Sequence, residues 1–247
     1  MKHRFGRSLP LVTSLTILSL AVYYLRFLVT GDPKDVLSYF LSDLAFLPLE
    51  ILLVTVILQR ILNEREKRSL LRKMNMVIGA FFSEVGTNLL GAMTGCHGES
   101  QQLRADLAVA VNWSVGDFAE ARRKLKNHKH PIAPGPEDLL RLRSFLLGKR
   151  GFMLALLQNP NLLEHDTFTE LLWAVFHLTE ELALRPDLDR LSDKDRLHLA
   201  GDAKRAYVLL ALEWMSYLEH LCTAYPYLYS LAVRMNPLNP EACPEIK

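Results

Sequence analysis

The chain has 247 residues, of which 50% are hydrophobic, and its formal net charge is only +2. A charge so close to zero excludes bulk basicity as a basis for nucleic-acid binding, and no nucleic-acid-binding motif accompanies the local basic clusters. The three cysteines, Cys96, Cys222 and Cys243, form neither a disulfide framework nor a CxxC pair, so we expect reduced thiols and no bound cofactor.

The first apolar segment follows a basic N-terminus, residues 1–8, which we expect in the cytoplasm. Residues 9–29 hold a single charge, Arg26, and are long enough for a helix that crosses a bilayer core of about 30 Å. A cleaved signal peptide would begin in the same way, but no small-residue cleavage site closes this segment. Tyr23 and Tyr24 occur near its end instead, as in an interfacial anchor. We therefore predict an uncleaved transmembrane helix.

A short polar loop, residues 30–39, precedes a second predicted transmembrane helix over residues 40–62. Basic residues are frequent before the first helix and after the second, whereas the loop holds only Lys34. The positive-inside rule therefore places both termini in the cytoplasm, on one side of a plasma (inner) membrane. An alternative role for the basic residues after the second helix is pairing with Glu64 and Glu66 along the helix. The residues that we expect to contact anionic lipid head groups are Arg60, Arg65, Lys67, Arg68, Arg72 and Lys73.

Two carboxylates, Asp43 and Glu50, lie in the second apolar segment. Glu50 comes twelve residues before Leu62, so its Cα is expected about 18 Å from the cytoplasmic end of the span. A carboxylate at that depth is costly unless it is protonated, paired or hydrated, and such residues often mark ion pathways. One hypothesis is a ring of Glu50 side chains that lines an oligomeric channel or transporter. In the other, Glu50 only holds helices together, through hydroxyl groups of the first helix: Thr13, Ser14, Thr16 and Ser19.

The second helix is predicted to continue as a stalk into a cytoplasmic helical domain, residues 63–235. After a stretch that is charged on nearly every face, apolar side chains resume at helical spacing from Met74. Gly79, Ser83 and Gly86 lie on one side of this helix, where small side chains favour close contact with a neighbouring helix, such as that of a second copy.

Four further helical segments are predicted. The last of them is opened by Ser192 and Asp195, which resemble a capping box, and it is kinked or ended by Pro226. These helices are expected over residues 101–127, 136–157, 161–184 and 193–225. The tail, residues 236–247, has three prolines and no apolar periodicity, which predicts an extended, weakly ordered end. No strand pattern occurs, so the predicted fold is all-α: a two-helix transmembrane hairpin whose second helix continues into a cytoplasmic bundle of about five helices.

Histidines and carboxylates occur on the predicted helices at spacings that suit a metal site. His177 and Glu181 are four residues apart, as are His198 and Asp202, and Glu170 shares a helical face with His177. The Glu-x-x-His pairs of di-iron bundles are missing, however, and solvated charges on polar helix faces account for the same residues. We therefore expect a domain without bound metal.

Motifs for nucleophilic catalysis and nucleotide binding are missing from the sequence. Cys96, His97 and Glu99 are adjacent, but they lie in a glycine-rich turn, and adjacency in sequence does not make a catalytic triad. We predict a non-enzymatic membrane protein whose cytoplasmic domain serves interaction or signalling, with the lipid bilayer, further copies of the chain and a cytoplasmic protein as partners. An oligomeric ion or proton channel is the alternative, and a helical-bundle metal enzyme is the third hypothesis.

Overall fold

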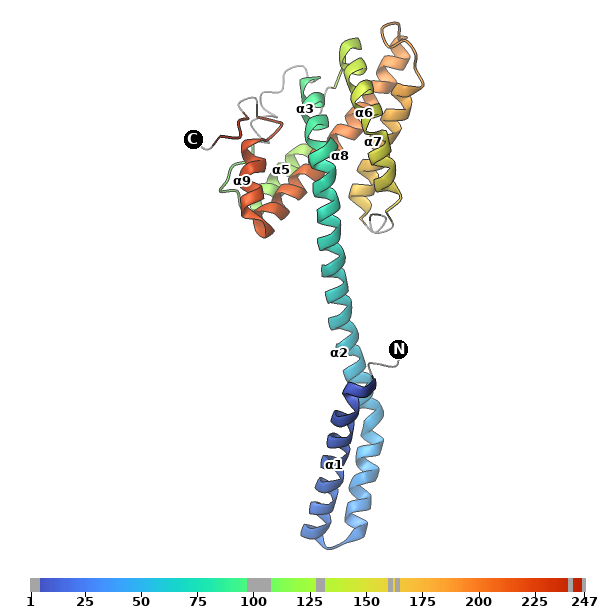
Figure 1. Cartoon of the computed structure of the whole chain (residues 1–247), viewed down its shortest axis with the longest axis vertical. Coiled ribbons are helices and arrows are strands. Elements are labelled where there is room, and N and C mark those ends of the chain that lie inside the picture. Colours follow the sequence, from blue (N-terminus) through green and yellow to red (C-terminus); the bar gives the residue numbers. More distant parts are fainter. Residues whose placement is uncertain are drawn as a thin grey trace. The chain divides into compact units, whose positions relative to one another are not determined.

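The computed structural model describes residues 5–96, 108–127, 132–159, 162, 165–239 and 242–245. Within these ranges every extended regular element is a helix, and no β-strand occurs, so the prediction of an all-α fold is confirmed (Figure 1). The chain divides into two compact units, Met1–Lys67 and Arg68–Lys247. The boundary between them falls within one long helix, α2 (Pro33–Phe81).

The first unit contains α1 (Phe5–Thr30) and the N-terminal part of α2. Gly31 connects them with a φ of 67°, a left-handed conformation that glycine adopts readily. Asp32 Oδ1 then accepts a hydrogen bond from the backbone N of Lys34 at 2.9 Å, and Pro33 occupies the first helical position. These two residues start α2 well before the predicted position 40. The connection therefore consists of Gly31 and Asp32 rather than the polar loop predicted over residues 30–39.

Polar contacts join α1 to α2 close to this connection. The Tyr23 hydroxyl donates a hydrogen bond to Asp43 Oδ2 at 2.7 Å, and Arg26 Nη2 lies 3.3 Å from Asp35 Oδ2. The Arg26 guanidinium also lies over the Tyr39 ring, 3.1 Å from its centroid. Asp43, one of the two carboxylates singled out in the sequence, is therefore already paired within the chain.

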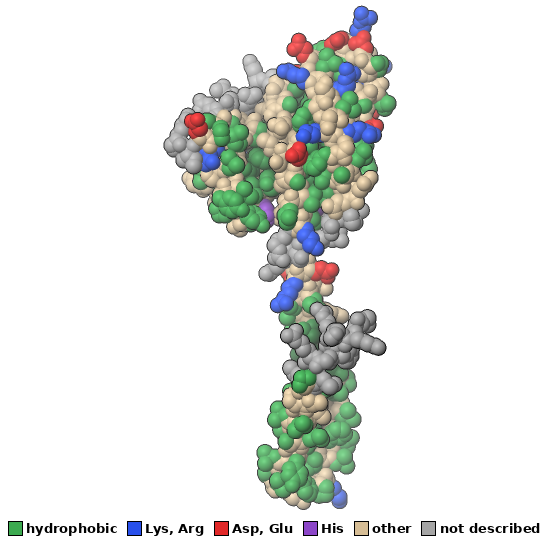
Figure 2. All heavy atoms as spheres, in the orientation of Figure 1, with side chains coloured by type: hydrophobic (Ala, Val, Ile, Leu, Met, Phe, Trp, Pro, Cys, Tyr) green, Lys and Arg blue, Asp and Glu red, His purple; other side chains and the backbone are tan. Residues whose placement is uncertain are grey.

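Apolar side chains of the first unit lie on its surface (Figure 2). Val12–Thr30 and Pro33–Lys67 are long and apolar enough to cross a membrane, and 0% of the most apolar part of each is buried. Val29, for example, is 79% exposed. Neither segment contributes to a protein core.

A third stretch of comparable length and composition, Lys73–Gly95, behaves differently. It comprises the end of α2, a wide π-helical turn η1 (Phe82–Gly86) and α3 (Thr87–Gly95). Eight of its large apolar side chains are at most 2% exposed and lie in the core of the second unit, whereas Met76 is 73% exposed. The eight are Met74, Ile78, Phe81, Phe82, Val85, Leu89, Leu90 and Met93. The same helical path thus begins among exposed apolar side chains and ends inside a folded core.

The remaining described helices surround this path. α8 contacts α3, α5, α7 and α9, and α7 also packs against α6 (Figure 1). Their bounds are α5 (Val115–Asn127), α6 (Pro136–Leu157), α7 (Asp166–Ala183), α8 (Asp193–Ala224) and α9 (Pro226–Arg234). The apolar side chains of α7 from Phe168 to Leu182 that share one helical face are buried in the core.

Capping residues decide where these helices begin. Ser192 Oγ accepts a hydrogen bond from Asp195 N at 3.2 Å, which is the first bond of the predicted capping box. Asp195 Oδ2 accepts from the Ser192 hydroxyl at 2.7 Å, rather than from the Ser192 backbone N as a full capping box requires. Ser114 and Asp117 form a similar pair, with Ser114 N donating to Asp117 Oδ2 at 2.7 Å, so α5 begins at Val115. The helix predicted from residue 101 is therefore wrong over residues 108–114, and residues 101–107 lie outside the described part of the chain.

The structure bears on two further expectations. A Cβ at Gly79 would lie 3.1 Å from Oη of Tyr217 in α8, and one at Gly86 would lie 2.5 Å from Cδ1 of Phe82. The neighbouring helix that Gly79 admits is therefore α8 of the same chain. Ser83 is exposed, and contact with a second copy stays a prediction.

The tail begins with a turn rather than an extended segment, because Asn239 N donates to the Asn236 carbonyl at 2.9 Å. Asn236 and Leu238 are also buried, at 1% and 2% exposed.

Candidate functional site

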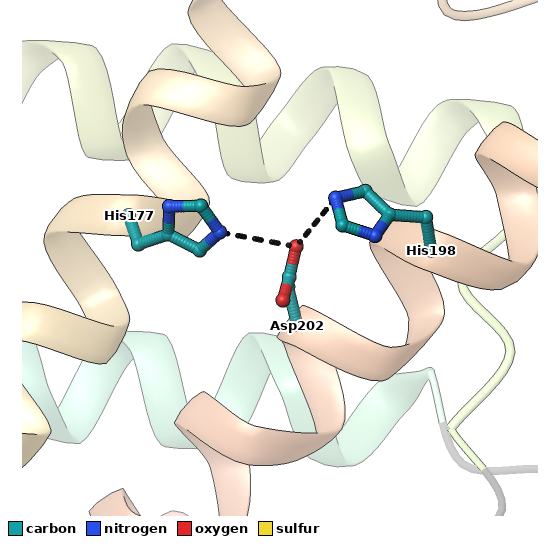
Figure 3. Close-up of side chains that lie close together, drawn as sticks. All are labelled: His177, His198 and Asp202. Atoms are coloured by element: carbon teal, nitrogen blue, oxygen red, sulfur yellow. Dashed lines mark ion pairs between the residues drawn. The ribbon is translucent and has the colours of Figure 1, made fainter.

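Two pairs of histidine and carboxylate side chains face each other between α7 and α8, and Figure 3 shows three of these four residues. His177 and Glu181 project from α7, and His198 and Asp202 project from α8. A spacing of four residues places each pair on one face of its helix. Packing of α7 against α8 then brings the two faces together.

The ligand atoms of this cluster are close to one another. Asp202 Oδ2 lies 3.5 Å from His177 Nε2 and 3.3 Å from His198 Nε2, and the three atoms lie within 4.8 Å of one another. Glu181 Oε2 is 3.4 Å from His198 Nε2, and Glu181 Oε1 is 3.9 Å from His177 Nε2. Four of the five predicted ligands therefore meet. The fifth, Glu170, is exposed and precedes His177 by about 10 Å along the helix axis.

Asp202 is the buried member of the cluster. Its side chain is 7% exposed, whereas those of His177 and His198 are 47% and 52% exposed. Among the described residues, Asp202 Oδ2 has no hydrogen-bond partner. Arg205 Nη1 lies 4.0 Å from the other oxygen, Asp202 Oδ1, and its side chain is 64% exposed. Since a buried carboxylate is unfavourable without compensation, a cation beside Oδ2 would stabilise it further.

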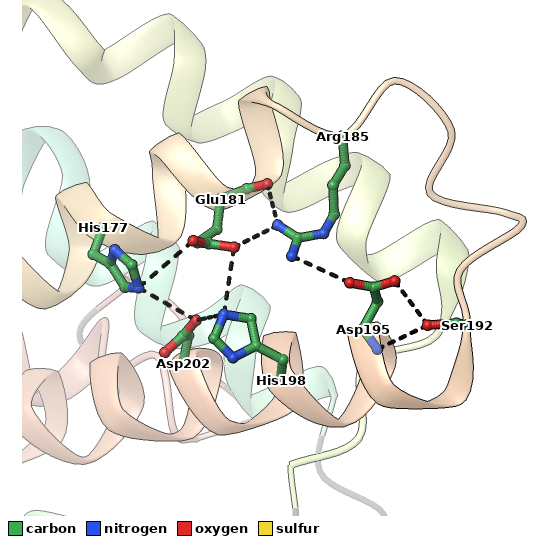
Figure 4. Close-up of polar contacts among 7 residues, drawn as sticks. All are labelled: His177, Glu181, Arg185, Ser192, Asp195, His198 and Asp202. Carbon is green, nitrogen blue, oxygen red and sulfur yellow. Dashed lines mark hydrogen bonds and ion pairs between the residues drawn. The ribbon is translucent and has the colours of Figure 1, made fainter.

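Arg185 borders the cluster and connects it to the start of α8 (Figure 4). Its Nη1 donates to Glu181 Oε2, and its Nη2 lies 3.4 Å from Asp195 Oδ1. The hydrogen bond from Arg185 lowers the pKa of Glu181, which holds this side chain as a carboxylate. The sequence prediction overlooked Arg185, although a Glu four residues before an Arg on a helix is a recognisable pair.

Cys96, the thiol of the adjacent Cys–His–Glu triplet, is unsuited to nucleophilic chemistry. It is 7% exposed, its Sγ donates to the Ala92 carbonyl at 3.4 Å, and burial raises its pKa to about 11. His97 and Glu99 lie outside the described residues.

Glu50 lies on the exposed surface of α2, and none of the described residues forms a hydrogen bond or an ion pair with it. Two of the hydroxyl groups considered as its partners are used elsewhere. Thr13 donates to the Pro10 carbonyl at 3.0 Å and Thr16 donates to the Val12 carbonyl at 2.8 Å.

Basic residues predicted to contact lipid are exposed where the structure describes them. Arg60, Arg65, Lys67 and Lys73 are exposed, whereas the side chains of Arg68 and Arg72 lie outside the described part.

Comparison with known proteins finds two family models that match separate parts of the chain. The model described as "MJ1433, N-terminal helical domain" matches residues 2–62, and that described as "Uncharacterized protein MJ1433, C-terminal helical domain" matches residues 70–234. The chain is 44% identical over 225 residues to "Uncharacterized protein MJ1433" of Methanocaldococcus jannaschii, which covers 91% of this chain and 90% of that relative. No solved structure matches.

Proposed function

We propose that this chain, which belongs to the MJ1433 family, is a non-enzymatic protein of the plasma (inner) membrane with a cytoplasmic helical interaction or signalling domain. In this proposal α1 and the first part of α2 form a hairpin that spans the bilayer twice, with both termini in the cytoplasm. The observation that carries it is the contrast between exposed and buried apolar helices. Val12–Thr30 and Pro33–Lys67 bury none of their most apolar residues, whereas Lys73–Gly95 lies partly in a protein core.

The exposed apolar helices of the first unit are more favourable in a bilayer than in water. Soluble monomers rarely expose contiguous apolar patches larger than a few hundred Å², so two unburied apolar helices are unfavourable in water. A bilayer removes this cost, because a helix satisfies its own backbone hydrogen bonds in hydrocarbon. α1 has 26 residues and is about 39 Å long, enough to cross a core of about 30 Å.

Charged residues favour the proposed orientation. Arg60, Arg65 and Lys67 are exposed at the end of the second apolar stretch, where anionic head groups attract basic side chains by about 1 kcal/mol each.

Large apolar side chains that remain exposed on the helical unit support the proposed interaction with a cytoplasmic protein. Trp173 is 57% exposed and Tyr227 is 71% exposed, and aromatic residues are enriched in protein interfaces.

Thiol labelling in intact cells tests the proposed topology. Single cysteines would replace Ser8, Lys34 and Lys73 in a background without Cys96, Cys222 and Cys243. We expect an impermeant maleimide to label position 34 in intact cells, and to label positions 8 and 73 only after permeabilisation. Release of the protein by alkaline carbonate, or labelling of positions 8 or 73 from outside, would contradict the proposal.

A second function, an oligomeric ion or proton channel, is favoured by one observation. Glu50 projects from an apolar helix with no partner among the described residues. In hydrocarbon such a carboxylate requires a partner or water, and contact between copies of the chain provides either of them.

A further inference from the structure

We propose that His177, His198 and Asp202 bind a divalent transition-metal ion, with Glu181 as a fourth donor. This inference concerns the helical unit and is independent of the membrane proposal. It reverses the expectation, drawn from the sequence, that the domain holds no metal. The reason for the reversal is that packing of α7 against α8 brings both His–carboxylate pairs to one point.

Donor spacing is the first argument. Imidazole nitrogens and carboxylate oxygens bind zinc at about 2.0–2.1 Å, so neighbouring donors of a tetrahedral centre lie about 3.3–3.4 Å apart. The separations from Asp202 Oδ2 to the two Nε2 atoms are 3.5 and 3.3 Å, and Glu181 Oε2 is 3.4 Å from His198 Nε2. These three separations therefore match a coordination shell, while Glu181 Oε1 is farther, 3.9 Å, from His177 Nε2.

Direction is the second argument. Both Nε2 atoms face Asp202 Oδ2 (Figure 3), yet this buried oxygen has no hydrogen-bond partner among the described residues. In a tetrahedral centre, the line from a donor to the metal deviates by about 35° from the line between two donors. The Nε2 lone pairs that point to a shared metal would therefore point away from Asp202 Oδ2, and no linear hydrogen bond would form between the ring nitrogens and this oxygen. A central cation accounts for both the proximity and the missing hydrogen bonds.

The donor set selects the class of metal. Two imidazoles with carboxylates suit zinc and iron(II), and also manganese, cobalt or nickel, whereas calcium and magnesium prefer oxygen donors alone. Arg185 binds Glu181 Oε2 and competes for its charge, so Glu181 is the weakest of the four donors. The half-exposed imidazoles leave the site open to ions from solvent.

Metal titration of the full-length protein tests the proposal. Protein purified in detergent without a polyhistidine tag would be stripped by a chelator and titrated with zinc by calorimetry and with cobalt by visible absorption. We expect one ion per chain. His177→Ala, His198→Ala and Asp202→Asn should each weaken affinity by at least about 100-fold. Glu181→Gln should weaken it by about tenfold, because the pairing of Glu181 with Arg185 makes it the weakest donor.

Matched controls separate this site from unspecific binding. Glu170→Gln on α7 and His220→Gln on α8 change the same residue types outside the cluster, and both should retain the affinity of the unchanged protein. Circular dichroism checks that every variant stays helical. The proposal is wrong if the unchanged protein binds no stoichiometric metal, or if the three ligand variants, still folded, bind it as tightly as the two controls. An unchanged affinity in Glu181→Gln would overturn the assignment of the fourth donor.

Discussion

Glu213 is a carboxylate in the core of the helical unit. It is 5% exposed, and its Oε2 accepts a hydrogen bond from Thr167 Oγ1 at 3.1 Å. Burial raises the pKa of Glu213, and the nearby His165 and the Thr167 hydroxyl offset part of this effect. Because the pKa is higher in the folded state, the folded protein retains a proton that the unfolded chain releases. Stability therefore falls as the pH rises from the unfolded pKa to the folded pKa.

We predict that Glu213→Gln stabilises the helical unit near neutral pH, since the neutral amide is cheaper to bury and still accepts the Thr167 hydrogen bond. The gain should vanish near pH 4, where Glu213 is largely protonated in the folded state. Urea unfolding followed by circular dichroism at both pH values measures the difference. A gain of equal size at both would refute the explanation, and Glu170→Gln, an exposed change, should have no such pH dependence.

Residue spacing predicted each of the two His–carboxylate pairs, but it could not predict that the two pairs lie next to each other. His177 with Glu181, and His198 with Asp202, follow from helical periodicity alone. Which pairs meet depends on the register of α7 against α8, which is set by buried side chains throughout both helices. The same register leaves Glu170 outside the cluster, although its spacing from His177 places it on the same face.

At the scale of elements, the π-helical turn η1 depends on one glycine. The Phe82 ring lies over Gly86, so a Cβ there would be 2.5 Å from Phe82 Cδ1. The ring has little room to move, because it stacks on Tyr217 at 5.2 Å and contacts Trp214 at 5.0 Å between centroids. Tyr217 and Trp214 both belong to α8, so η1 fixes how the end of α2 and α3 contact α8.

Replacement of Gly86 by alanine should lower the free energy of unfolding by about 1–3 kcal/mol, since the added methyl group overpacks the core. Gly148→Ala is the matched control, because nothing lies within 4 Å of a Cβ at that helical position. That control should raise the free energy of unfolding by about 0.4–1 kcal/mol, because alanine lowers the conformational entropy of the unfolded chain. Chemical denaturation of the three proteins provides the comparison, and equal effects of the two substitutions would contradict the proposed role of η1.

The start of a helix could be predicted from the sequence where a capping residue follows a polar loop, and was missed where it does not. Ser192 with Asp195 correctly predicted the start of α8. The start of α2 was placed too late because the continuous apolar run begins only near residue 40, although Asp32 and Pro33 hold the capping signal. Here local capping outweighs composition, since a helix terminus needs hydrogen-bond partners whatever the polarity of its first turn.

For the whole molecule, the function of Glu50 distinguishes an anchor from a channel. In proteoliposomes we expect no ion flux from the unchanged protein and no change in assembly size for Glu50→Gln, since a glutamine can still hydrogen-bond between helices. Flux that this substitution abolishes, in an assembly of the same size, would establish the channel instead. Asp43→Asn is the matched control, because Asp43 is already bonded to Tyr23 within the chain.

The buried stretch Lys73–Gly95 has a further consequence during synthesis. Phe82 packs against Trp214 and Tyr217, which the ribosome adds about 130 residues later. At about 5–20 residues per second this delay lasts roughly 7–26 s. During this delay Lys73–Gly95, which is apolar enough to cross a bilayer, lacks the α8 side chains that it packs against in the folded protein. It also directly follows two other apolar stretches, Val12–Thr30 and Pro33–Lys67. If α1 and α2 are inserted in a membrane as proposed, biogenesis requires that this segment be kept out of the insertion machinery until α8 emerges.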